Sequence, residues 1–315
     1  MEYRTLGKTG LKVSALSFGG SSLGSMFRTI DEAQAIETVH TALDLGINFI
    51  DTSPFYGLGS AETVLGKALK GVPRDSYHLA TKVGRYGDNV EDFDFSAARV
   101  KRSVDESLER MGVDYIDLIQ CHDIEYVDLD LVVNEALPAL REVQQAGKMG
   151  FVGITGFPLK AFPTVMNQAD VDTIQSYCHY CLNDHSLSDL LPYLKVKEIG
   201  VISSAPIAMR LLSDGALPDW HPAPQNVRDG CAKAVAFCKE RSEDISKLAV
   251  QFSVANPDVH AVFVGTANPD RIRKNAAWAE EPLDETLLAE VLKVLKPVHN
   301  ITWQTGLPEN NGPWQ

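Results

Sequence analysis

The chain has 315 residues, of which 44% are hydrophobic and 23% charged, a composition typical of a globular protein with a large core and not of a disordered chain. Its 29 Lys and Arg against 42 Asp and Glu give a net charge of −13. This charge repels phosphate backbones and anionic lipid, so neither nucleic acid nor a membrane is expected as a partner. There is no basic leader before an apolar run, and the cysteine count of five is odd, which together predict a cytoplasmic location.

Short β-rich apolar runs alternate along the chain with longer segments of helical period. The expected strands are residues 14–18, 48–51, 77–83, 115–122, 150–155, 173–179, 200–205 and 261–265. The expected helices are residues 31–45, 60–70, 96–111, 131–145, 159–169, 186–198, 230–241 and 246–254, and another begins near residue 269. Eight alternating units without a linker or a break in composition predict one closed (β/α)8 TIM barrel domain over residues 1–315. An open, doubly wound sheet is the alternative.

Two segments lie outside this repeat. Residues 1–13 contain a Gly-Lys-Thr-Gly turn between two short β-like pieces, which predicts a β-hairpin that closes the floor of the barrel. At the other end of the chain, residues 284–298 have helical period and residues 301–315 are irregular. We expect a C-terminal helix followed by a tail that could overhang the site.

Four polar side chains of different types follow neighbouring strands, at the barrel end where active sites of this fold lie. The second expected strand ends at Asp51 with Tyr56 five residues later, the third ends near Lys82, and the fourth ends at His122. A nearby ammonium lowers the pKa of a tyrosine hydroxyl, which is otherwise near 10, so Lys82 is expected to activate Tyr56. Asp51 would hold the ammonium, and His122 would bind a substrate oxygen. The set predicts proton transfer coupled to hydride movement.

Other readings of single residues are weaker or remain open. A lone Lys or Asp at a strand end is usually a solvated rim charge, and a lone loop Tyr usually packs; only the four together point to catalysis. The Gly-rich run at residues 19–24 lacks the Rossmann spacing. Cys178 and Cys181 have no second pair at ligand spacing, so no metal site is expected. Trp220, His221 and Trp303 either stack on a sugar or pack at the surface.

Five stretches resemble the aldo-keto reductase family: GINFIDTSPFYG, LATKVGR, YIDLIQCHD, GFVGITG and VGTANPDRIRKN. The resemblance covers essentially the whole chain. It implies that Asp51, Tyr56, Lys82 and His122 form a catalytic tetrad and that an extended nicotinamide dinucleotide lies across the barrel mouth. The implied cofactor contacts are Gly20, Ser21, Asp51, Thr155, Gln175, Ser204, Ala205, Ile207, Met209, Gly265, Thr266, Arg271 and Asn275. The implied substrate contacts are Tyr56, His122, Asp123 and Trp303.

The chain departs from the family pattern at several cofactor positions. Gly156 stands where many members have an Asn that holds the carboxamide, and Ser204 stands where an aromatic ring often stacks on the nicotinamide, which leaves Tyr177 as a candidate for stacking. Gly265 and Thr266 replace a Lys that often binds the 2′-phosphate, so NAD is the expected cofactor. Arg271 leaves weaker use of NADP open.

A narrower set of stretches, DFDFSAARVKRSVDESLER, CHDIE, SYCHY, DWHPAP and PVHNITW, is similar to the L-galactose dehydrogenase subgroup of the family. It implies NAD-dependent oxidation of a small-molecule aldose, L-galactose, at C1 to the lactone, by a monomer or small homo-oligomer. The alternatives are an L-fucose or D-arabinose (D-threo-aldose) 1-dehydrogenase, a general NADPH-dependent aldehyde reductase, and a cofactor-sensing binding module without turnover.

Overall fold

Eight parallel strands close into a barrel in the order β10-β3-β4-β5-β6-β7-β8-β9 in a computed structural model that describes residues 1–26 and 29–314. The strands are β3 (Leu16–Gly19), β4 (Phe49–Asp51), β5 (His78–Val83), β6 (Ile116–Cys121), β7 (Met149–Gly156), β8 (Thr173–Tyr177), β9 (Gly200–Ser204) and β10 (Ala261–Gly265). The predicted (β/α)8 barrel is confirmed, and the open sheet is excluded because β10 pairs with both β3 and β9.

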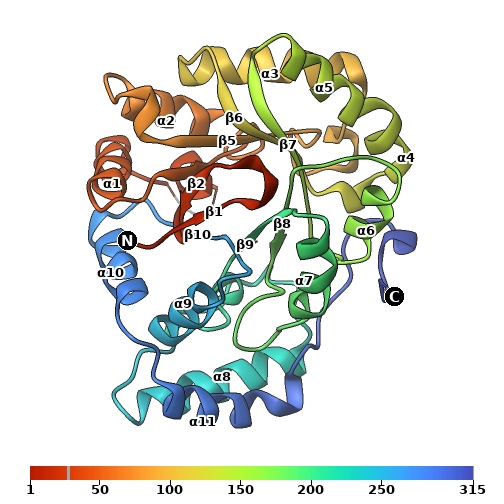
Figure 1. Cartoon of the computed structure of the whole chain (residues 1–315). Coiled ribbons are helices and arrows are strands. Elements are labelled where there is room, and N and C mark those ends of the chain that lie inside the picture. Colours follow the sequence, from red (N-terminus) through yellow and green to blue (C-terminus); the bar gives the residue numbers. More distant parts are fainter. Residues whose placement is uncertain (27–28, 315) are drawn as a thin grey trace.

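Helices form a ring outside the barrel (Figure 1). They are α1 (Glu32–Asp44), α2 (Ser60–Leu69), α3 (Ala97–Met111), α4 (Leu129–Leu131), α5 (Leu137–Gln145), α6 (Ala161–Met166), α7 (Leu187–Val196), α8 (Gln225–Lys239), α9 (Ile245–Ala255), α10 (Pro269–Glu280) and α11 (Glu285–Leu295). Their apolar stripes face the strands: in α3, for example, Val100, Val104 and Met111 are buried. This burial holds the strand ends, and the loops that follow them, at fixed positions.

The expected helix over residues 131–145 is interrupted. Between α4 and α5, residues Val132–Ala136 form a wider π turn, in which the N–H of Leu137 donates to the carbonyl of Val132. Pro138 follows at the start of α5. Because proline has no N–H and its ring clashes with the carbonyl four residues earlier, the chain cannot continue as a regular α-helix through this point.

The expected start of a helix at residue 230 is also wrong, because α8 begins at Gln225. Gly230 therefore lies inside the helix and does not begin it. A Cβ atom at Gly230 would come within 2.6 Å of the side chain of Val298. The glycine lets the segment after α11 pack directly on α8, a tertiary reason that local sequence does not reveal.

The N-terminal hairpin consists of β1 (Tyr3–Thr5) and β2 (Lys12–Ser14), which pair antiparallel. It turns through Gly10, whose φ of 73° suits glycine, and it lies in front of the barrel strands in Figure 1. Leu6 and Val13 are fully buried and pack on Phe49 and Phe263 from the barrel interior. The predicted hairpin therefore closes the barrel at the amino ends of its strands.

No helix within residues 1–26 and 29–314 is long and apolar enough to cross a membrane. In the same residues, no group of three or more His, Cys, Asp and Glu side chains is arranged to hold a metal ion. All five cysteines are buried and free.

Candidate active site

Lys82, Asp51 and Tyr56 form a buried cluster at the carboxyl ends of β4 and β5. The ammonium of Lys82 donates to Asp51 Oδ2 at 2.5 Å, to the carbonyl of Thr52 at 2.8 Å and to the hydroxyl of Tyr56 at 3.3 Å. The side chain of Lys82 is 1% exposed and that of Asp51 3%. Because parallel strands end at the same rim, the chain brings together two side chains 31 residues apart.

Burial dominates the acidity of Tyr56. It raises the pKa of the hydroxyl to about 12, although the ammonium of Lys82 acts in the opposite direction. Lys82 lowers the pKa of Tyr56 as expected, but the loss of solvation outweighs the charge, so the pKa lies above its ordinary value. For Lys82, burial alone lowers the pKa, but the Asp51 carboxylate and Tyr56 hold it above the ordinary value, so the amine stays charged beside the phenol.

His122 follows β6 and lies edge-on to Tyr56, with ring centroids 5.8 Å apart and an interplanar angle of 88°. Burial lowers the pKa of its ring to about 3, so it is neutral at physiological pH. Its Nδ1 lies 3.0 Å from Oγ of Ser53. That oxygen also accepts the N–H of Phe55, and its hydroxyl hydrogen is available to donate to Nδ1. Nε2 then carries the ring proton and can donate it to a substrate oxygen.

Asp123, the residue after His122, is paired with Arg85 at the same rim. Arg85 donates to Asp123 Oδ2 at 2.6 Å, and the N–H of Asp123 donates to Oγ1 of Thr155 at 3.0 Å. Although burial alone raises the pKa of Asp123, the charge and the hydrogen bond of Arg85 help to hold it below the ordinary value. Arg85 was not among the expected site residues; its position three residues after Lys82 in LATKVGR is the signal that could have found it.

A second carboxyl group on this loop, Glu125, binds the C-terminal tail. Its Oε1 accepts from the N–H of Phe157 at 3.1 Å and from the hydroxyl of Thr305 at 3.2 Å, and its carbonyl accepts from Leu307. The tail thus crosses to the site, where Trp303 stacks on Phe157 with ring centroids 4.8 Å apart. Glu125 was also missed, since its partner Thr305 is 180 residues away.

The residues expected around the nicotinamide form a connected polar group. Gln175 accepts from Gln120 Nε2 at 2.9 Å and donates to Ser204 Oγ at 2.9 Å. Gln120 also reaches towards Asp51 at 3.4 Å, so this group continues into the catalytic cluster. Thr155 is engaged with Asp123. The ring of Tyr177 packs on Phe157, with centroids 5.1 Å apart.

The loop after β9 has an unusual backbone. Four non-glycine residues have positive φ: Ala205 (59°), Ala208 (48°), Met209 (50°) and Arg210 (85°). Such backbone strain gathers at ligand sites. Ile207 lies inside this run, so the expected cofactor contacts Ala205, Ile207 and Met209 lie on the strained segment.

The opposite side of the mouth carries the two expected glycines. A Cβ at Gly20 would come within 2.8 Å of the Asp51 carbonyl, and one at Gly265 would come within 3.3 Å of both the Gly19 carbonyl and Ser21 Oγ. These close approaches leave no space for a side chain at either position. The bare backbone here, the polar group around Gln175 and the strained loop after β9 fit a nicotinamide dinucleotide.

The residues expected near the adenosine lie on and before α10. Arg271 is exposed, Asn275 is buried, and Thr266 accepts the N–H of Asn268. The side chain of Asn268 caps α10 by accepting the N–H groups of Asp270 and Arg271, so these two donors are already occupied.

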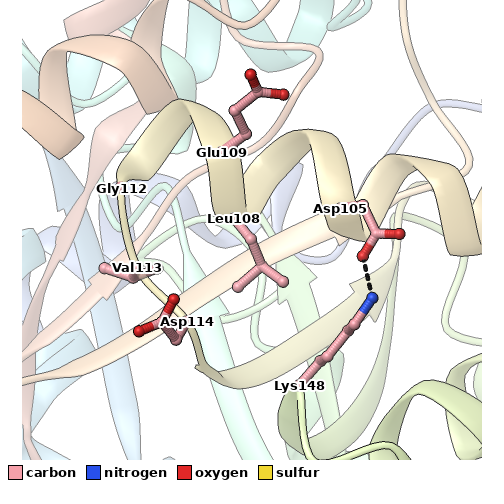
Figure 2. A pocket seen from close by; sticks show the side chains of 7 residues that line it. All are labelled: Asp105, Leu108, Glu109, Gly112, Val113, Asp114 and Lys148. Atoms are coloured by element: carbon pink, nitrogen blue, oxygen red, sulfur yellow. Dashed lines mark hydrogen bonds and ion pairs between the residues drawn. The ribbon is translucent and has the colours of Figure 1, made fainter.

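A shallow groove of about 410 Å³ lies elsewhere on the surface (Figure 2). Leu108 and Gly112 at the end of α3 line it, together with an ion pair between Asp105 and Lys148 at 2.5 Å. Gly112 precedes β6 and Lys148 precedes β7, so the groove lies at the amino ends of the strands, opposite the catalytic cluster. It holds none of the groups described above.

Comparison with known proteins gives concordant matches. The Aldo/keto reductase family matches residues 15–296. The chain is 49% identical to L-galactose dehydrogenase of Arabidopsis thaliana, over 98% of this chain and 99% of the relative. It is 32% identical to D-arabinose 1-dehydrogenase of Saccharomyces cerevisiae, over 94% and 95% of the two chains. Among solved structures, the aldo-keto reductase AKR11C1 from Bacillus halodurans in its holo form superposes with a TM-score of 0.81 at 29% identity, covering 96% of this chain and 98% of that one.

Proposed function

Because the chain belongs to the aldo/keto reductase family of oxidoreductases, we propose that it is an aldose 1-dehydrogenase that oxidises L-galactose at C1 to the lactone with NAD. The observation that carries the chemical part is the contact between the Tyr56 hydroxyl and the buried, charged Lys82 at 3.3 Å. The 49% identity to an L-galactose dehydrogenase over nearly the full length supports the substrate.

In this proposal Tyr56 takes the proton from the C1 hydroxyl group. The Lys82 ammonium stabilises the phenolate form of Tyr56 that accepts this proton, and Asp51 keeps the ammonium charged and directed at Tyr56. His122, neutral and held by Ser53, donates Nε2–H to the oxygen on C1 and so orients the sugar. A bound nicotinamide dinucleotide supplies the hydride acceptor. Gln175 and Ser204 would hold its carboxamide, and the loop 205–209 its pyrophosphate.

The preference for NAD rests on Gly265 and Thr266, neither of which offers a charge to a 2′-phosphate. Arg271, exposed on α10, supports weaker use of NADP. We further propose a cytoplasmic protein, because its five cysteines are all free. A monomer or small homo-oligomer is in keeping with a site built from one chain.

The test is the formation of reduced cofactor with L-galactose, L-fucose, D-arabinose and D-galactose, each with NAD and with NADP. The proposal predicts the highest kcat/KM for L-galactose with NAD. The identity to a D-arabinose 1-dehydrogenase favours D-arabinose as the second candidate substrate. No turnover of any sugar, together with reduction of simple aldehydes by NADPH, would contradict the proposal.

A further inference from the structure

We propose that Asp123 makes the enzyme require a hydroxyl group on the carbon next to the reacting one, by accepting a hydrogen bond from the 2-hydroxyl of the aldose. This inference rests on the function proposed above and adds the feature of the substrate that is selected. Tyr56 and His122 form hydrogen bonds with the oxygen on C1, and Asp123 accepts one from the hydroxyl group on C2.

The first argument is the position of the carboxylate. Ser53 occupies Nδ1 of His122, so Nε2 is the nitrogen that faces the substrate. Oδ2 of Asp123 lies 3.6 Å from that Nε2. Oxygens on adjacent sugar carbons are close enough together to contact two neighbouring protein groups at once. A sugar whose C1 oxygen accepts from Nε2 therefore brings its 2-hydroxyl to Asp123.

The second argument is electrostatic. The charge of Asp123 acts on the hydroxyls of Tyr56 and Tyr177 and helps to raise the pKa of each, after the larger effect of burial. The carboxylate therefore lies near the catalytic hydroxyl. Its own pKa is lowered, since the charge and the hydrogen bond of Arg85 act against burial, so it is an anion and accepts hydrogen bonds without donating any.

The third argument is unused acceptor capacity. An ionised carboxylate has about four acceptor sites. Asp123 is 5% exposed, and its oxygens accept from Arg85 at 2.6 Å and from Thr155 at 3.4 Å. A buried carboxylate with capacity left over favours a ligand that donates hydrogen bonds, as the hydroxyls of an aldose do and a simple aldehyde does not.

Arg85 fixes this carboxylate in place. Its guanidinium lies over the ring of Phe55, 3.7 Å from the centroid, so its position is set from two sides. It also balances the charge of Asp123, which lets a neutral sugar approach without burying an uncompensated anion. Arg85 is thus a positioning residue, and Asp123 makes the contact.

The experiment compares two sugars that differ by one oxygen: D-arabinose and 2-deoxy-D-ribose, which is D-arabinose without its 2-hydroxyl. Removing a hydrogen bond to a charged group should lower kcat/KM by about 10- to 100-fold in the unaltered enzyme. In Asp123→Asn the ratio of kcat/KM for D-arabinose to kcat/KM for 2-deoxy-D-ribose should fall to about 3 or less, since a neutral amide accepts a hydrogen bond more weakly than a carboxylate does. Because the readout is a ratio, a general loss of activity in the variant does not mimic this result.

Asp117→Asn is the matched control. Asp117 lies near the amino end of β6 and pairs with Arg74 at 2.5 Å, so this variant also breaks a close Asp–Arg pair, but away from the site. Its ratio should equal that of the unaltered enzyme. If Asp123→Asn does not fold, Arg85→Lys, which keeps the charge but loses the forked geometry, should lower the ratio instead.

L-Galactose, assayed in parallel, tests the proposed function separately. If L-galactose is oxidised while the unaltered enzyme turns over D-arabinose and 2-deoxy-D-ribose equally well, the role of Asp123 is wrong and the function stands. An unchanged ratio in a folded Asp123→Asn enzyme also overturns the proposed role of Asp123. If no sugar is oxidised with NAD or NADP, both proposals fail.

Discussion

Gly156 has no side chain at the point where the carboxyl group of Glu125 lies: a Cβ there would be 2.9 Å from Glu125 Oε2. Glu125 thereby fits between the end of β7 and the C-terminal tail, fully buried. Within the described residues its Oε2 has no hydrogen-bond partner. The loop, the strand end and the tail thus meet at one buried carboxyl group.

The stability of the protein should therefore depend on Glu125 and on pH. Burial, followed by the charge of Asp123, raises its pKa from 4.5 to about 8. The folded state keeps the proton that the unfolded chain releases, so the stability linked to Glu125 is full below pH 4.5 and is lost as pH rises to about 8. Glu125→Gln cannot ionise and should lose less free energy of unfolding over this range.

Urea unfolding across this pH window measures the effect. Glu309→Gln is the control, because Glu309 is an exposed glutamate in the same tail and its removal should leave the pH dependence unchanged. Parallel curves for Glu125→Gln and the unaltered protein would mean that Glu125 is not protonated in the fold.

Tyr56→Phe should lower kcat by about 10²- to 10⁴-fold, because it removes the general base and leaves the binding surface in place. The Kd of NAD, measured by fluorescence quenching, should change by less than about threefold. Tyr193→Phe is the control, since the hydroxyl of Tyr193 contacts Asn167 on an exposed surface. A Tyr56→Phe enzyme of normal kcat would remove Tyr56 from the mechanism.

The buried pair of Lys82 and Asp51 should show strong coupling in stability. Asp51→Asn leaves the ammonium of Lys82, which is 1% exposed, without its carboxylate partner. This change should lower the free energy of unfolding by about 3–5 kcal/mol. The double variant Asp51→Asn, Lys82→Met removes the charge as well and should be more stable than Asp51→Asn alone. Denaturant unfolding of the four proteins in this cycle measures the coupling; additive effects would contradict it.

The pH dependence of kcat/KM for sugar oxidation should reflect the ionisation of Tyr56 and not that of His122. With the pKa of His122 lowered to about 3, the ring stays neutral and produces no inflection near its ordinary pKa of 6.5. With Tyr56 as the proposed base and its pKa raised to about 12, kcat/KM should rise with pH, by up to about tenfold per pH unit. A plateau that begins near neutral pH would contradict the assignment.

Arg271→Gln should alter cofactor choice. Losing one charged contact to a 2′-phosphate should raise KM for NADP by about tenfold, while KM for NAD should change by less than about twofold. Arg273→Gln is the control because Arg273 is exposed on the same helix and pairs with Asp270. Equal effects on both cofactors would place Arg271 away from the phosphate.

The barrel and the meeting of four side chains could be predicted from sequence because both follow from local patterns. Strand ends can be read from short apolar runs, and parallel strands place Asp51, Lys82 and His122 at one rim whatever the loops do. The net pKa of Tyr56 could not be predicted, since it depends on how completely the folded chain excludes water from the hydroxyl.

The contacts around the rim could not be predicted for a different reason. Arg85 and Asp123 are 38 residues apart and meet at the rim, where Asp123 has a positive φ of 49°. The predicted start of α8 at residue 230 is too late. Gly230 lies inside the helix because it packs against Val298, which is far along the chain. Such pairings depend on loop conformation and long-range packing, which no period in the sequence records.

The tail that Glu125 holds also has a consequence for the order in which the protein is made. The last barrel strand ends at Gly265, whereas Trp303 and Thr305 lie well beyond it. A ribosome therefore makes all eight strands before the tail residues that contact Glu125. The strands of the barrel and the tail residues that bury Glu125 thus leave the ribosome at different times, and the partners of this buried carboxyl group are made after every strand of the barrel.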